Sequence, residues 1–141
     1  MGNNIDKICS IINHIIYNIH IPESEHDIFS YFLYGHCNVF IEILDNIFKD
    51  DIEFYISDEF CHVIGKIDDF FYDARGFLPN IEYDKYEKID KERFYYLVNI
   101  KAFGNYDSNY DQKVIEDGTK LGFKKYNEVF KIKNLIRQKE E

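Results

Sequence analysis

The hydrophobic period of the chain changes near residue 50, and this change limits the folds that are open to it. Before residue 50, apolar residues recur every three or four positions, which is the spacing of amphipathic helices. After it, short runs rich in β-branched and aromatic residues are separated by polar breaks, which is typical of strands. We therefore expect an α+β fold that begins with helices and continues with a small sheet.

Three helices are predicted before the change. An apolar stripe over residues 5–19 indicates the first, and residues 28–33 indicate a short second helix that ends at Gly35. A third helix begins very near Cys37, which places this cysteine in its first turn. The residues predicted to form the polar face of this third helix are Asn38, Glu42, Asp45, Asn46 and Lys49.

Three strands are predicted after the change, over residues 52–56, 61–64 and 70–73. Gly76 and Pro79 then close the unit. The strands are expected to form an antiparallel meander that packs on the third helix.

The rest of the chain is predicted with less detail. Residues 90–100 fit either a helix or a strand, and residues 104–111 form a polar stretch typical of a loop. Helices are expected over residues 107–121 and 124–137, with Gly118 and Gly122 interrupting them. Because 141 residues with 45% apolar side chains suit one core, we expect one domain over residues 1–141.

The charge of the chain is acidic and unevenly distributed. The formal net charge of -9 argues against a nucleic-acid partner, because phosphate binding depends on lysine and arginine. Residues 22–73 hold thirteen acidic residues and two lysines, whereas residues 120–139 hold seven basic residues and one glutamate. A basic partner is therefore favoured for a site in the acidic part, although a solvated acidic surface explains the same pattern.

No apolar run approaches the roughly 18 residues of a membrane span, and the first residues do not resemble a secretory signal. The three cysteines do not form an even-numbered disulfide framework. We expect a cytoplasmic protein with reduced thiols and no membrane partner.

Cys37 is the candidate nucleophile. A helix N-terminus lowers the pKa of a thiol through its unpaired N–H groups and the positive end of the helix dipole. Gly35 permits a sharp turn into the third helix and leaves the thiol accessible. The backbone N–H groups of Cys37 and Asn38 are placed to stabilise an oxyanion.

His62 and Asp73 are the candidate base and its orienting carboxylate. If the turn between their strands covers residues 66–69, His62 lies directly opposite Asp73. A turn shifted by one residue at its centre pairs Ile64 with Asp73 instead. His62 and Asp73 share a face in either register, because side chains alternate along a strand.

These residues resemble the catalytic core of papain-like cysteine enzymes in the transglutaminase-like order of cysteine, histidine and aspartate. The resemblance covers about residues 30–78 and rests on three motifs. The stretch from His62 to Gly76 is also similar to arylamine acetyltransferases and, more loosely, to small cell-wall peptidases. The motifs are Gly35-His36-Cys37 at a helix start, His62-Val63 on a strand, and Phe71-Tyr72-Asp73-Ala74-Arg75-Gly76.

The resemblance implies a papain-like core with additional N- and C-terminal helices, and a hydrolase or transferase that needs no cofactor. Cys37 would be the nucleophile, His62 the general base and acid, and Asp73 the orienting group. Amide bonds in a protein or peptide are the expected substrate, as for a protease, amidase or deamidase. The expected substrate-binding residues are Tyr34, Gly35, His36, Asn38 and Arg75.

Each feature also has a structural interpretation. Taken alone, Cys37 is typical of a small buried side chain and His62 of a hydrogen-bonded histidine on a strand. Asp73 alone is typical of a turn residue. Arg75 fits a structural ion pair. A zinc site made of His36-Cys37 and Cys61-His62 fits less well, because the side chains of adjacent residues diverge too widely to meet one ion. The alternative function is a non-enzymatic acidic interaction protein, such as a phage or mobile-element inhibitor of a host protein.

Overall fold

The computed structural model describes residues 4–21, 27–33, 36–60, 62–103 and 108–130, and these have an α+β fold. Among the described residues, no helix is both long enough and apolar enough to cross a membrane. The helices are α1 (Ile5–Asn18), α2 (Ile28–Leu33), α3 (Cys37–Phe48), α4 (Lys91–Asn99) and α5 (Ser108–Val129), with short 3-10 turns η1 (Lys49–Asp51) and η2 (Tyr83–Lys85). The strands are β1 (Ile52–Ser57), β2 (His62–Ile67), β3 (Phe70–Asp73), β4 (Gly76–Phe77) and β5 (Glu87–Ile89).

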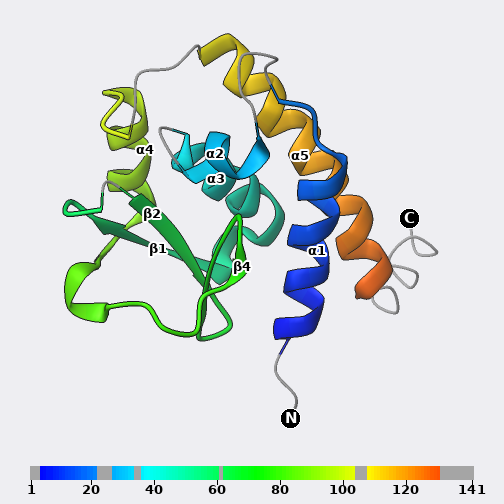
Figure 1. The fold of residues 1–141 in the computed structure, drawn as a ribbon, viewed down its shortest axis with the longest axis horizontal. Helices are drawn as coiled ribbons and strands as arrows, with labels where there is room; N and C mark the ends of the chain where they lie inside the picture. The colour runs from blue at the N-terminus through cyan, green and yellow to red at the C-terminus, as the bar shows by residue number, and fades with distance from the viewer. Residues whose placement is uncertain (1–3, 22–26, 34–35, 61, 104–107, 131–141) are drawn as a thin grey trace.

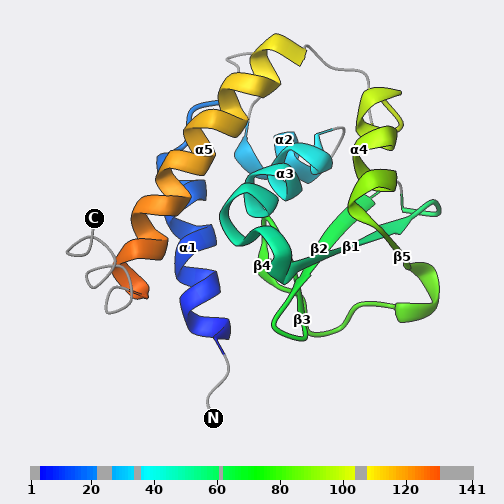
Figure 2. The same cartoon turned by 180° about the vertical axis from the view of Figure 1, so that it is seen from behind.

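Helix α3 is the central element, with the sheet on one side and the pair α1 and α5 on the other (Figure 1). The view from behind shows the same layers, with α1 and α5 side by side (Figure 2). Ten of the twelve residues of α3 are buried, because both of its sides are covered. The predicted helices over residues 5–19 and 28–33 and the predicted start at Cys37 are confirmed.

The sheet is antiparallel throughout and has the strand order β4-β3-β2-β1-β5. The three predicted strands are confirmed as its centre. Asp68 and Asp69 both have positive φ, at 53° and 72°, and form a two-residue turn between Ile67 and Phe70. Such turns match the twist of a hairpin. Gly65 pairs with Tyr72, and continuing this register places Ile64 opposite Asp73.

Residues 78–86 connect the two edges of the sheet, from β4 to β5. Tyr83 of this connection packs edge-on against Phe71 of β3, at a ring distance of 5.3 Å. The connection therefore covers one face of the sheet. Neither β4 nor β5 is predicted from the sequence.

The C-terminal part differs from the prediction. Residues 90–100 are mostly helical, and Asp90 caps α4 by accepting a hydrogen bond from the Arg93 N–H at 2.7 Å. The predicted break between residues 121 and 124 is wrong, because α5 is one helix through Gly118 and Gly122. The predicted loop over residues 104–111 is wrong from residue 108 onwards, and residues 104–107 and 131–137 lie outside the described ranges.

Gly118 and Gly122 lie where α5 packs against α3. A Cβ at Gly118 would lie 2.4 Å from Cδ1 of Ile43, and a Cβ at Gly122 would lie 2.0 Å from Cδ1 of Ile47. Both distances are well below van der Waals contact. Glycine therefore lets α5 approach α3 closely, and this advantage outweighs its low helix propensity.

Gly118→Ala is expected to lower the free energy of unfolding, although alanine is the better helix former. Overpacking costs about 1–3 kcal/mol, against a propensity gain of about 1 kcal/mol. Urea unfolding measures the difference. Adding Ile43→Val removes the clashing Cδ1 and should restore part of the loss, whereas a single variant as stable as the parent would contradict the close approach.

Candidate active site

The imidazole of His62 is held by Asp73. Its Nε2–H donates a hydrogen bond to Oδ2 of Asp73 at 2.9 Å, and both side chains are buried. The observed register explains this contact, because His62 lies diagonally across from Asp73 on the same face. Since Nε2 is the donor, Nδ1 carries the lone pair that can accept a proton.

Asp73 also binds Arg75. The backbone N–H of Arg75 donates to Oδ1 at 2.8 Å, and its Nη2 donates to Oδ2 at 2.6 Å. Burial raises the pKa of Asp73, but the hydrogen bonds from His62 and Arg75 outweigh it, and the net pKa is lowered. Asp73 is therefore a carboxylate at neutral pH, and Arg75 balances its charge.

Cys37 begins α3, and its side chain is only 2% exposed. Burial raises the pKa of its thiol to about 11, although the backbone N–H groups of Val63, Asn38 and Cys37 itself lower it. The expectations of an accessible thiol and of a lowered thiol pKa are both wrong. The N–H groups lower the pKa of the thiol as expected, but burial raises it by more. The thiol is therefore protonated at neutral pH.

The thiol and the imidazole reach β2 from different sides. A Cβ at Gly65 would face Ile41 of α3, so this face of the strand packs on the helix. Alternation places His62 on the opposite face. The thiol meets the strand at the N–H of Val63, the residue after His62. The thiol and the imidazole therefore both lie near the start of β2, but on opposite faces of the strand.

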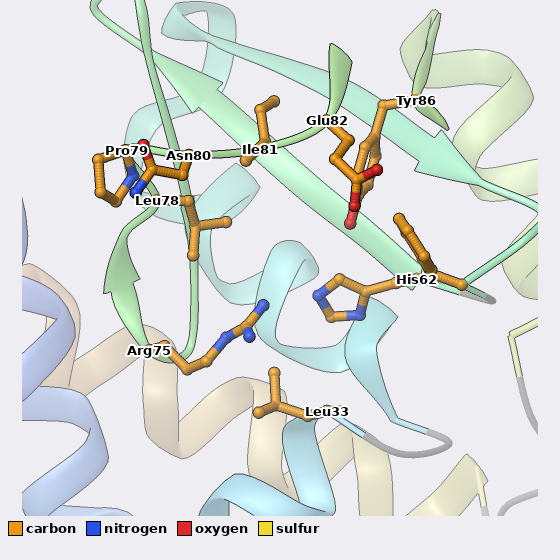
Figure 3. Close-up of a pocket in the computed structure, with 10 residues that line it drawn as sticks. Leu33, His62, Arg75, Leu78, Pro79, Asn80, Ile81, Glu82 and Tyr86 are labelled. Carbon is orange, nitrogen blue, oxygen red and sulfur yellow. The ribbon is translucent and has the colours of Figure 1, made fainter. Parts of the chain in front are cut away.

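A pocket of about 460 Å³ opens beside His62. Figure 3 shows the side chains of His62 and Arg75 directed toward one another in this pocket, with Glu82 and Tyr86 on one side and Leu33 on the other. The side chain of Arg75 is 53% exposed despite its ion pair. Cys37 and Asp73 are not among the lining residues. The remaining lining residues are Phe60, Leu78, Pro79, Asn80 and Ile81.

The other predicted site residues do not converge on the pocket. The His36 ring stacks on Tyr31 at 4.2 Å, and its Nε2 lies 3.7 Å from Oδ1 of Asp111. The Asn38 side chain donates to Oε2 of Glu42 at 2.8 Å. Arg75 alone of the expected substrate-binding residues that are described lines the pocket. Tyr34, Gly35 and Cys61 lie outside the described residues.

The predicted polar face of α3 is partly wrong. Asn38 and Asp45 are 1% and 7% exposed, because other helices cover this side. Asp45 accepts a hydrogen bond from the Tyr95 hydroxyl at 2.7 Å and pairs with Lys91 at 2.9 Å. Asn46 and Lys49 are exposed, as predicted.

Tyr86 and Glu82 were not predicted as site residues. Burial raises the pKa of Tyr86, and the charges of Asp73, Cys37 and Glu82 raise it further, while Arg75 lowers it. Tyr86 lines the same pocket as His62, Arg75 and Glu82, and the charges of Asp73 and Arg75 act on its hydroxyl. No local sequence signal marks these residues, because the connection from β4 brings them to the pocket.

Within the described residues, no group of three or more histidine, cysteine, aspartate or glutamate side chains is arranged to hold a metal. Among the described residues, Cys9 and Cys37 take part in no disulfide. The described residues around the start of β2 include a thiol, an imidazole and the Asp73–Arg75 ion pair.

No protein-family model, curated protein or solved structure matches this chain, so its own residues carry the functional assignment.

Proposed function

We propose that this chain is a cysteine-dependent acyl-transfer enzyme acting on amide bonds in a protein or peptide. The hydrogen bond from His62 to Asp73 carries the proposal, because it leaves Nδ1 as a proton acceptor beside an accessible pocket. The backbone N–H groups directed at the Cys37 sulfur give it further support.

The proposed reaction begins with a neutral thiol. Once the site has opened and the sulfur and the imidazole lie side by side, the Cys37 sulfur attacks the carbonyl carbon while its proton passes to Nδ1 of His62. The protonated imidazole then gives this proton to the leaving amine as the carbon–nitrogen bond breaks. Water or an acceptor next attacks the thioester and loses its proton to His62. That proton finally returns to the departing Cys37 sulfur, which restores the thiol.

Attack on a substrate requires the site to open, because the Cys37 sulfur is almost fully buried. The proposed resting state is therefore closed, with ionisation of the thiol coupled to opening and to proton transfer rather than completed beforehand. The raised thiol pKa agrees with such a state, since a buried thiolate would lack solvation.

A biotinylated peptidyl acyloxymethyl ketone tests the proposal, because it alkylates a nucleophilic cysteine at a substrate site. We expect labelling of Cys37 in the parent and in Cys9→Ala, which removes the other described cysteine. Labelling should be absent in Cys37→Ala and about 10²- to 10⁴-fold slower in His62→Ala, the range expected for loss of a general base. Intact mass spectrometry with peptide mapping measures both.

Equal rates of Cys37 labelling in the parent and in His62→Ala would contradict the proposal. Circular dichroism of each variant at the labelling temperature separates a lost base from a lost fold. Slow reaction of Cys37 with iodoacetamide in the absence of a peptidyl group is expected, because that reagent does not bind the pocket.

The second candidate function is an acidic interaction protein, and the burial of Cys37 favours it. In that case His62, Asp73 and Arg75 form a structural network, and Cys37→Ala retains full biological activity. Asp50 and Asp51 are exposed and available to a basic partner, whereas Asp45 is committed to Tyr95 and Lys91. Salt-insensitive binding of the partner would count against this function.

A further inference from the structure

The pocket beside His62 combines an apolar wall with one carboxylate. Leu78, Pro79 and Ile81 line it from the connection between β4 and β5, and Phe60 and Tyr86 add aromatic surface. Figure 3 shows the Glu82 carboxylate directed into the same space, toward His62. An elongated apolar group that ends in a charge matches this arrangement of surfaces.

The ion pairs around the pocket indicate the sign of the charge that the ligand should carry. Arg75 lies against Asp73 with Nη2 at 2.6 Å from the carboxylate, so these two charges balance. Glu82 makes no ion pair with any described residue, although Lys85, three residues later, pairs with Glu59 at 3.0 Å. The pocket therefore presents one uncompensated negative charge, and a cationic ligand is favoured.

We infer that the pocket binds a basic side chain of a peptide, with the alkyl stem against the apolar wall and the cationic group at Glu82. Lysine and arginine both have this form, since each carries a charge at the end of a methylene stem. The aromatic rings of Phe60 and Tyr86 add favourable surface for a cation. The inference names the substrate class of the proposed active site and therefore rests on the proposed function.

Binding to the Cys37→Ala protein tests the inference without requiring turnover. The probes are Nα-acetyl-lysine methylamide and Nα-acetyl-norleucine methylamide, which share a four-carbon stem and differ in the charge. We expect the lysine probe to bind about fivefold to tenfold more tightly, as for a partly exposed charge-assisted contact. Chemical shift titration of the backbone amides measures the two dissociation constants and locates the site at residues 78–86.

Glu82→Gln should abolish the difference between the probes, because it removes the charge and keeps the shape. Glu87→Gln is the matched control, since Glu87 is also exposed and lies next to Tyr86 but does not line this pocket. Equal affinity for both probes, or an unchanged preference in Glu82→Gln, would overturn the inference.

The outcomes distinguish the inference from the proposed function. Selective lysine binding without labelling of Cys37 would preserve the basic-peptide site and remove the enzymatic function. Labelling of Cys37 that depends on His62, without any preference for the lysine probe, would preserve the enzyme and remove this substrate class.

Discussion

Asp73→Asn is expected to lower the rate of Cys37 alkylation by the peptidyl ketone by about 10²- to 10⁴-fold, the range of a disrupted general base. Asparagine has nearly the shape of aspartate but no charge. It stabilises the protonated His62 less well, and its amide group permits the ring to adopt the other tautomer, in which Nδ1 holds a proton and cannot accept one. Single-turnover labelling at saturating ketone measures the rate.

The same substitution changes stability in a defined pH window. The folded pKa of Asp73 is lowered, so its contribution to stability is present above its unfolded pKa of about 4 and is lost as pH falls through the folded pKa. Asp73→Asn should lose about 1–3 kcal/mol at pH 7, because His62 and Arg75 lose a charged acceptor. The variant and the parent should converge as the pH is lowered.

Asp84→Asn is the control, since Asp84 is an exposed residue of the connection from β4 to β5. It should leave both rate and stability unchanged. If folded Asp73→Asn is labelled at the same rate as the parent, Asp73 does not act through His62.

The hairpin of His62 and Asp73 could be predicted because it depends on local pattern. Alternating apolar residues on both sides of a polar break indicate two paired strands, and the period of two keeps His62 and Asp73 on one face. The sequence leaves open where the turn is centred, and hence whether His62 or Ile64 lies directly opposite Asp73. Positive φ at Asp68 and Asp69 sets a two-residue turn, which selects the register that places Ile64 opposite Asp73.

The pocket could not be predicted, because it depends on pairing between distant residues. Strand β5 joins the sheet by pairing Phe54 with Ile89, and only this pairing leads residues 78–86 across the sheet. The burial of Cys37 is equally non-local. A helix start is visible in the sequence, but the depth at which it is covered depends on the elements packed around it.

The second large effect is expected at Glu42 of α3 and concerns how stability depends on pH. Burial raises the pKa of this carboxyl to about 7, and the charges of Asp111 and Asp45 raise it further, while the hydrogen bond from Asn38 lowers it. Because the folded pKa lies above the unfolded value, the contribution to stability is full below about pH 4.5 and is lost as pH rises through about 7.

Glu42→Gln is therefore expected to stabilise the protein at pH 8 by about 2–3 kcal/mol, since it cannot ionise and still accepts the hydrogen bond from Asn38. Near pH 4.5 the variant and the parent should have similar stability. Urea unfolding across this range measures the effect, with Glu116→Gln, at an exposed position on α5, as the matched control. If the difference in stability between the parent and Glu42→Gln stays the same as pH rises, Glu42 ionises without cost. Water would then reach the side of α3 that other helices cover.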